Sequence, residues 1–87
     1  MNGLKTNYHY KGNLIYSSHS QIAKYIIKKN YQNILDIGCN QGFIGYALRR
    51  RLWKGKIIGL DINNKYEKTV INKGYDQFIN IDAEKNF

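Results

Sequence analysis

The apolar positions of this chain switch repeatedly between helical spacing and short strand-like runs, in the order helix, strand, helix, strand, helix, strand. Helical spacing occupies residues 21–29, residues 43–52 and the segment between the N-capping Asn63 or Asn64 and Gly74. Runs typical of buried strands occupy residues 34–37, 56–62 and 77–81. This alternation predicts an α/β fold with a Rossmann-like parallel sheet and right-handed crossovers.

The chain is one small domain at most, because 87 residues can bury only a modest core. Residues 1–17 show little periodicity and are expected to form an irregular segment or lid, while residues 18–87 form a partial Rossmann-like domain. No apolar run is long enough to cross a bilayer, and the N-terminus lacks the apolar region of a signal peptide. The single cysteine, Cys39, excludes an internal disulfide. We therefore expect a cytoplasmic protein without a membrane partner.

The formal net charge of +8 would suit nucleic acid or an anionic surface. The cations are spread along the whole chain, however, and the one dense cluster is Arg49–Arg51 with Lys54 and Lys56. Because this cluster falls near a predicted helix C-terminus, where the helix dipole favours cations, we interpret it as a solvated helix end. Nucleic acid is therefore the less favoured partner.

Three carboxylates lie at or near the ends of successive predicted strands, namely Asp36, Asp61 and Asp82. The carboxyl ends of parallel strands meet at one edge of a sheet, where such folds bind their ligands. Asp36 alone could equally cap the next helix. Three acids at equivalent positions favour a ligand site.

The glycines of the turn after the first predicted strand do not match a dinucleotide site. The fingerprint G-x-G-x-x-G, started at Gly38, requires glycine where Asn40 and Phe43 stand. Asp36 would also repel a pyrophosphate, and the turn lacks the Gly-Lys pair of a phosphate-binding loop. An NAD-type oxidoreductase is therefore a weak alternative.

S-adenosylmethionine (SAM) suits these residues better, because it carries a sulfonium, an ammonium group and no phosphate. Gly38 and Gly42 allow the backbone to approach a ligand closely, since neither has a Cβ. Asp36 would complement the cationic amino-acid end of SAM. Asp61 would accept hydrogen bonds from the ribose hydroxyls, as the equivalent acid does in dinucleotide-binding folds.

Three segments in order resemble the first three motifs of the class I SAM-dependent methyltransferases. They are ILDIGCNQG at residues 34–42, IIGLDI at 57–62 and INIDA at 79–83, and the resemblance covers about residues 18–84. Asn40 stands where many family members have glycine, but asparagine tolerates a left-handed backbone better than most residues. The resemblance implies that the chain is the SAM-binding part of a methyltransferase.

The resemblance also implies a role for each residue around the methionyl end of SAM. Asp36, Gly38 and the turn at residues 39–42 would surround this end. The whole cofactor site that it implies consists of Asp36, Gly38, Cys39, Asn40, Gly42, Phe43, Asp61, Ile62, Asp82 and Ala83.

The adenosyl end of SAM would contact the second and third motifs. Asp61 would hold the ribose, and Ile62 would pack on the adenine. Asp82 would meet the exocyclic amine of adenine, with the Ala83 backbone beside the ring.

In the family, the fold continues for four more strands, and the fourth motif usually lines the transfer site. We therefore expect this chain to be the N-terminal half of a methyltransferase, truncated or remnant, and to be inactive alone. Its catalytic residues and its methyl acceptor are not predicted. All three helices would cover one face of the sheet. The other face would be a bare apolar patch that invites self-association or pairing with the C-terminal half.

A non-catalytic module is the main alternative, namely a basic domain of the same fold that binds SAM, nucleic acid or a partner chain. Cys39 would suit a nucleophile, because a helix N-terminus lowers a thiol pKa, but the sequence shows no paired base. We therefore interpret it as a small turn residue. His9 and His19 lack the spacing of metal ligands, so no metal site is predicted.

Overall fold

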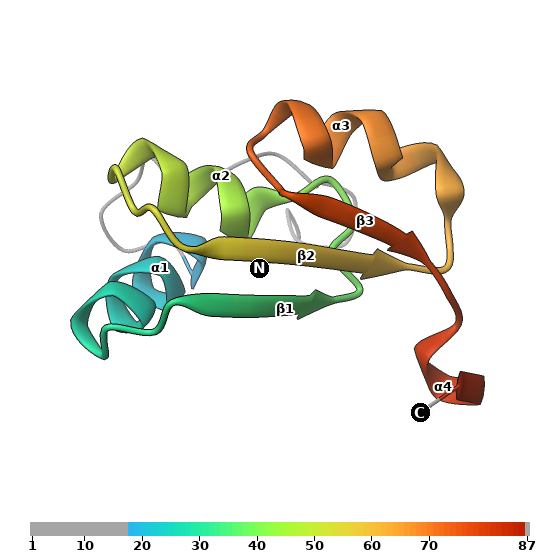
Figure 1. Ribbon diagram of the computed structural model, residues 1–87, viewed down its shortest axis with the longest axis horizontal. Helices are drawn as coiled ribbons and strands as arrows, with labels where there is room; N and C mark the ends of the chain where they lie inside the picture. Colours follow the sequence, from blue (N-terminus) through green and yellow to red (C-terminus); the bar gives the residue numbers. More distant parts are fainter. Residues whose placement is uncertain (1–17, 87) are drawn as a thin grey trace, which may run out of the picture.

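The computed structural model describes residues 18–86 and contains the predicted order of helices and strands (Figure 1). Its elements are α1 (Ser18–Lys28), β1 (Asn33–Ile37), α2 (Phe43–Arg50), β2 (Lys56–Asp61), η2 (Asn64–Tyr66), α3 (Glu67–Asn72), β3 (Gln77–Asn80) and α4 (Ala83–Asn86). The lid predicted for residues 1–17 lies outside the described residues. None of the described helices combines the length and the apolar character needed to span a membrane.

The three strands form a parallel sheet in the order β1-β2-β3. In its register Ile37 lies beside Leu60, which lies beside Ile79. The three strands therefore end together at one edge of the sheet, as their alternation with helices requires. The predicted α/β fold with a parallel sheet is confirmed.

Helix ends follow the turn residues of the sequence. Asn63 caps η2 by accepting a hydrogen bond from the Lys65 N–H across 3.1 Å, and Gly74 follows α3 with a φ of 102°. Helix α2 stops at Arg50, because Leu52 has a left-handed φ of 62° and leaves the helix. Leu52 is 77% exposed, so the helical spacing predicted through residue 52 continues beyond the end of the helix itself.

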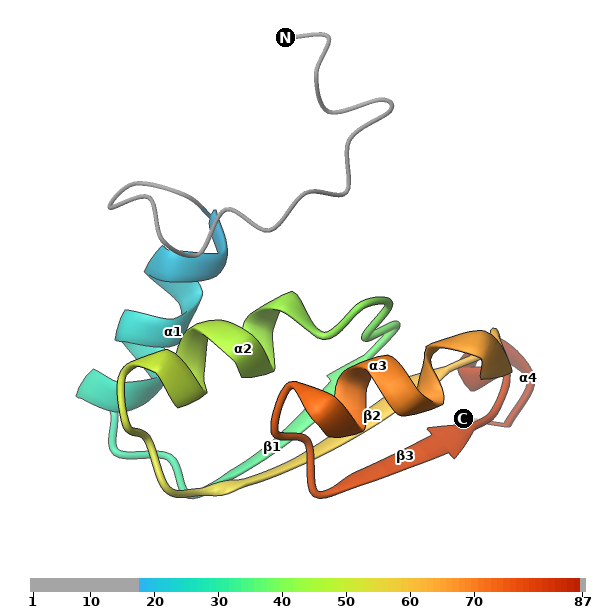
Figure 2. The ribbon, with the colours of Figure 1, turned by 90° about the horizontal axis from the view of Figure 1, so that it is seen from above.

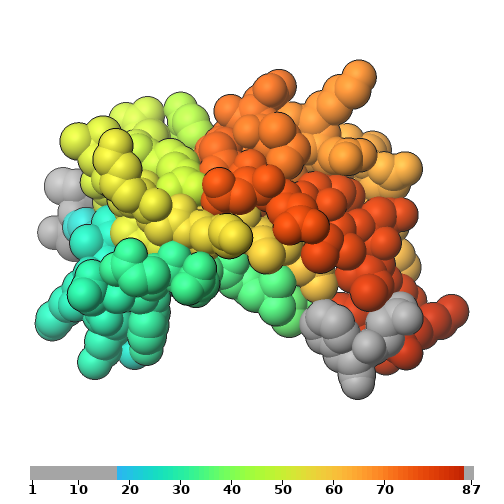
Figure 3. Space-filling model, viewed as in Figure 1, coloured from blue at the N-terminus to red at the C-terminus, as the bar shows by residue number. Residues whose placement is uncertain are grey.

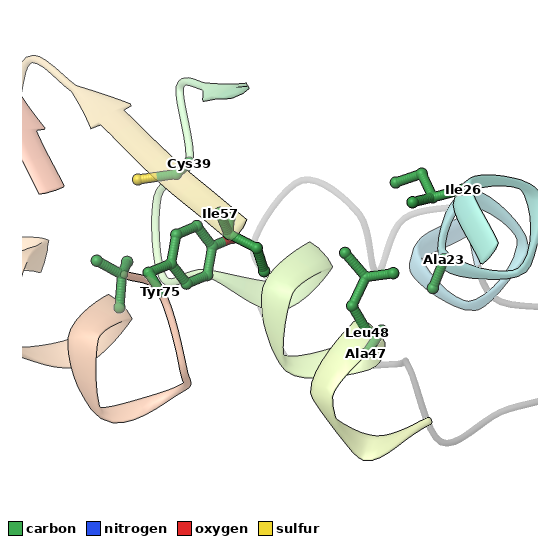
Figure 4. Close-up of a cluster of buried hydrophobic side chains, with 8 residues drawn as sticks. Ala23, Ile26, Cys39, Ala47, Leu48, Ile57 and Tyr75 are labelled. Atoms are coloured by element: carbon green, nitrogen blue, oxygen red, sulfur yellow. The ribbon is translucent and has the colours of Figure 1, made fainter. Parts of the chain in front are cut away.

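Helices α1, α2 and α3 all lie on one side of the sheet (Figure 2). The core between these layers consists of Ala23, Ile26, Cys39, Ala47, Leu48, Ile57, Val70 and Tyr75 (Figure 4). On α1 only Ala23 and Ile26 enter this core, whereas Ile22 and Ile27 are 45% and 37% exposed. The buried stripe of α1 is therefore narrower than its apolar sequence predicts.

Among residues 18–86 no helix lies on the opposite face of the sheet, which is partly bare (Figure 3). Leu35 and Ile37 on this face are each 53% exposed, while Ile34 of β1 packs against the core. The apolar run of residues 34–37, typical of a buried strand, is therefore covered by the described residues on one face only. The expectation of an uncovered apolar face is supported for the described part of the chain.

Candidate functional site

The turn between β1 and α2 is built from three residues with left-handed backbone, Gly38, Asn40 and Gly42, whose φ angles are 69°, 53° and 82°. Glycine adopts this conformation without strain, and asparagine adopts it more readily than most residues. The Cys39 N–H donates to the Leu60 carbonyl across 2.9 Å, which anchors the turn to β2. The turn thus brings α2 back over the carboxyl end of the sheet.

Asp61 at the tip of β2 accepts one backbone hydrogen bond on each carboxylate oxygen. Oδ1 accepts the Asn63 N–H and Oδ2 accepts the Asn40 N–H, each across 2.8 Å. The side-chain amide of Asn80 donates to the carbonyls of Asp61 and Ile62 across 3.1 and 3.0 Å. These bonds hold the turn, the tip of β2 and the end of β3 in one arrangement.

A pocket of about 360 Å³ opens beyond the carboxyl ends of the strands. Its lining residues are Ile37, Gly38, Leu60, Asp61, Ile62, Ile81, Asp82, Ala83 and Glu84. Gly38, Asp61, Ile62, Asp82 and Ala83 of the predicted cofactor site therefore meet around a single hollow, although they come from three separate motifs. An apolar floor flanked by carboxylates suits a flat, hydrogen-bonding ligand.

Glu84 is a pocket residue that sequence reasoning missed. Its backbone N–H donates to Oδ1 of Asp82 across 3.0 Å, in the first turn of α4. An aspartate just before a helix can be recognised in a sequence as a capping residue. Helix α4 has only four residues, however, so no helical periodicity reveals it in the sequence.

The remaining predicted residues, Asp36, Cys39, Asn40, Gly42 and Phe43, do not line this pocket. The Cys39 side chain is 5% exposed and belongs to the core. Burial, followed by the charges of Asp36 and Asp61, raises the pKa of the Cys39 thiol to about 12. The thiol is thus protonated at neutral pH, which agrees with a turn residue rather than a nucleophile.

Asp36 lies at the helix-covered side of β1, below the turn. It accepts a hydrogen bond from the Tyr75 hydroxyl, and the two oxygens are 2.5 Å apart. Burial raises the pKa of Asp36, although the Tyr75 hydrogen bond and the charge of His19 act in the opposite direction. The carboxylate is therefore an internal group, held by a residue that sequence analysis did not single out.

Phe43 and His19 pack together beside the turn. Their ring centroids are 5.2 Å apart in an edge-on arrangement, and the Lys73 ammonium lies 5.2 Å from the Phe43 ring centroid. Asn40 belongs to the turn itself, and its buried Oδ1 has no hydrogen-bond partner among residues 18–86. No spacing in the sequence connects His19 with Phe43 or Asp36, because the three residues come from different elements.

The interpretation of the arginine cluster as a solvated helix end is wrong for Arg49 and Arg51. Arg49 donates to the carbonyls of Gly74, Trp53 and Gly55 across 2.8–2.9 Å and forms an ion pair with Asp76 at 3.1 Å. Helix α2 ends against the loops that precede β2 and β3, so Arg49 in its last turn faces carbonyl groups rather than water.

Arg51 is likewise committed within the fold. It donates to the Ala47 carbonyl across 3.0 Å and to the Ser20 hydroxyl across 2.5 Å, which ties α2 to α1. Arg50 of the same run is exposed. Two of the three arginines therefore serve packing. Within the described part of the chain, no group of three His, Cys, Asp or Glu side chains could hold a metal ion.

The structure is similar to two solved structures of the plantazolicin methyltransferase BpumL. One is in complex with a monoazolic desmethylPZN analog and SAH, and the other is in complex with SAH. Each has a TM-score of 0.55 and 25% sequence identity, over 79% of this chain and 28% of that chain. This chain therefore spans less than a third of the length of BpumL. Comparison with protein-family models and with curated proteins found no match.

The similarity defines the class of fold. The parallel sheet with its helices on one face forms part of a methyltransferase fold. The position of the pocket, beyond the carboxyl ends of the strands, is the usual ligand position of such open α/β sheets.

Proposed function

We propose that this chain is the SAM-binding part of a SAM-dependent methyltransferase. The observation that carries the proposal is the meeting of residues from three sequence motifs around one pocket at the strand ends. Two structures of a similar methyltransferase hold SAH, the product that SAM leaves after methyl transfer, which supports the same ligand here.

The pocket residues fit the adenosyl end of SAM. Each oxygen of Asp61 accepts one backbone N–H and retains acceptor capacity for a ribose hydroxyl. Ile62 is 68% exposed beside it and offers an apolar surface for the adenine ring. Asp82 would accept a hydrogen bond from the exocyclic amine of adenine, and the Ala83 backbone would lie along the ring edge.

The turn residues fit the amino-acid end. Gly38 has open space where a Cβ would stand, so a ligand can approach its backbone closely. The buried Oδ1 of Asn40, which lacks a partner among the described residues, would accept a hydrogen bond from an ammonium group. Asp36 would supply the negative charge that complements this group.

Bound SAM supplies a sulfonium methyl group that a nucleophile of the acceptor attacks in line. The contribution of this chain is to orient the adenosyl and methionyl ends and to exclude water from one side of the ligand. No side chain among residues 18–86 is required to act as a base. The acceptor would approach from outside the residues described here.

The proposal is tested by calorimetry of the purified chain with SAH, SAM and NAD. We expect SAH and SAM to bind, NAD not to bind, and the chain alone to transfer no methyl group. Absence of SAH and SAM binding would overturn the proposal. Turnover by the chain alone would overturn the expectation that further chain is needed.

The second candidate is a basic module that binds nucleic acid. Its support is the net charge of +8, but Arg49 and Arg51 are engaged in the fold. RNA binding that weakens steeply with salt, in a chain that does not bind SAH, would favour this module.

A further inference from the structure

Tyr75 connects the carboxylate of β1 with the first turn of α2. Its side chain is 3% exposed, and its hydroxyl donates to Oδ2 of Asp36 across 2.5 Å. The same hydroxyl accepts the Gly45 N–H across 3.1 Å. That N–H belongs to the first turn of α2, where backbone donors have no partner within the helix. One buried phenol thus satisfies two groups from different elements.

The Tyr75 ring occupies space that is open because three neighbouring residues are glycines and have no Cβ. A Cβ on Gly42, Gly45 or Gly59 would lie 2.9, 2.1 or 3.0 Å from the nearest ring atom. The contacts at Gly42 and Gly45 are shorter than real Cβ atoms make, and the contact at Gly59 is tighter than most. The ring therefore has one position, and its hydroxyl has a fixed direction toward Asp36.

The hydroxyl engages only one oxygen of Asp36. Among the hydrogen bonds of residues 18–86, none reaches Oδ1 of Asp36. A carboxylate held through Oδ2 cannot rotate freely, so Oδ1 keeps a constant direction. A half-buried carboxylate without this bond would be free to rotate or to take up a proton.

We propose that Tyr75 is a positioning residue of the SAM site, which orients Asp36 so that Oδ1 accepts the ammonium group of the ligand. This inference rests on the proposed function. It predicts that Tyr75 contributes to recognition of the amino-acid end of the ligand and not of the adenosyl end.

The test compares SAH with 5′-methylthioadenosine, which has the same adenosyl group and no amino-acid end. Tyr75→Phe keeps the ring in its slot and removes only the hydroxyl. Because a hydrogen bond to a charged group is lost, we expect SAH affinity to fall about tenfold. The affinity for 5′-methylthioadenosine should stay within about twofold, since the adenosyl contacts do not change.

The pH dependence of SAH binding gives a second measurement, which a loss of packing alone would not change. Burial and the charge of Asp61 raise the pKa of Asp36, whereas the Tyr75 hydrogen bond and the charge of His19 lower it. Removal of the Tyr75 hydroxyl therefore raises this pKa further. SAH binding by Tyr75→Phe should therefore weaken at a higher pH than binding by the wild type, as the solution is acidified. Binding of 5′-methylthioadenosine should show no such displacement.

Two further variants separate positioning from stability. Ile57→Val removes one core methylene and destabilises the fold without touching the hydroxyl or Asp36. It should leave both affinities unchanged in the folded protein. Asp36→Asn keeps an acceptor for the Tyr75 hydroxyl and removes the charge. It should therefore lose affinity for SAH and keep its affinity for 5′-methylthioadenosine. This variant tests the inference even if Tyr75→Phe does not fold.

The outcomes distinguish the positioning role of Tyr75 from the proposed SAM-binding function on which it rests. A wild-type chain that binds neither ligand would overturn the proposed function. A wild type that binds SAH would retain it, but equal losses of both ligands in Tyr75→Phe would overturn the positioning role. Full SAH affinity in Tyr75→Phe or Asp36→Asn would overturn it as well. A Tyr75→Phe loss that persists undiminished in the Asp36→Asn background would show that Tyr75 acts through another group.

Discussion

The backbone N–H of Asn40 donates to Oδ2 of Asp61 across 2.8 Å and joins the turn after β1 to the tip of β2. The same carboxylate binds the Asn63 N–H through its other oxygen. Asp61 therefore shapes the turn that would hold one end of the ligand, in addition to its proposed contact with the ribose. A substitution at this residue should affect both ends of the site.

Asp61→Ala is expected to weaken SAH binding more than about tenfold, because hydrogen bonds to a charged acceptor are lost at the ribose. Asp76→Ala is the matched control. Asp76 also accepts a backbone N–H, that of Ile57 across 2.8 Å, but at the opposite end of the sheet. It should lower the free energy of unfolding and leave SAH affinity in the folded chain unchanged. Calorimetry and urea unfolding of both variants check this, and unchanged affinity in Asp61→Ala would remove the ribose role.

Ionised Asp36 is unfavourable for the fold, since burial raises its pKa above the usual 3.8 despite the Tyr75 hydrogen bond and His19. The native chain then binds this proton more tightly than the unfolded chain. The free energy of unfolding therefore falls as the pH rises from 3.8 through the folded-state pKa. The penalty is absent below this window and complete above it.

Asp36→Asn cannot ionise, so it should be more stable than the wild type at neutral pH and lose that advantage below pH 3.8. Urea unfolding of the variant and the wild type, at neutral pH and below pH 3.8, measures the difference between their free energies of unfolding. The same variant should bind SAH more weakly, which makes Asp36 a residue kept at a cost in stability. A variant that is less stable than the wild type at neutral pH would contradict the sign of this argument.

The parts of the molecule that the sequence predicts are those that local periodicity or strand direction determines. The apolar runs predict the sheet, and parallel strands bring Asp61 and Asp82 to one pocket. The contact of Tyr75 with Asp36 spans 39 residues and follows from no spacing rule. The hydrogen bonds of Arg49 to three loop carbonyls cannot be predicted from the sequence either, because they depend on where two loops meet after folding.

Cys39 should resist alkylation in the native chain. Its side chain is 5% exposed, and burial raises the thiol pKa to about 12, so both access and the thiolate fraction are low. We expect no iodoacetamide adduct at neutral pH in the intact-mass spectrum of the folded protein. The urea-unfolded chain should gain one adduct, because Cys39 is the only cysteine. Rapid labelling of the folded chain would show that the thiol is accessible.

Gly45→Ala should destabilise the fold, against the usual effect of this substitution. In a helix interior, alanine is favoured over glycine by about 1 kcal/mol. Here the new Cβ would lie 2.1 Å from Cε1 of Tyr75, and the ring is also bounded by Gly42 and Gly59. Relief requires Tyr75 to move and to give up its bonds to Asp36 and to the Gly45 N–H. Overpacking of this kind costs about 1–3 kcal/mol, so the free energy of unfolding should fall.

Gly38→Ala is the control for Gly45→Ala, because nothing lies within 4 Å of its added Cβ. Its loss comes only from the left-handed backbone, with a φ of 69°, and should be about 1–2 kcal/mol. Near-ultraviolet circular dichroism should report displacement of the Tyr75 ring in Gly45→Ala alone. If Gly45→Ala instead gains the helical propensity of alanine and becomes more stable, the ring does not fill the slot, and the direction of its hydroxyl toward Asp36 loses its physical basis.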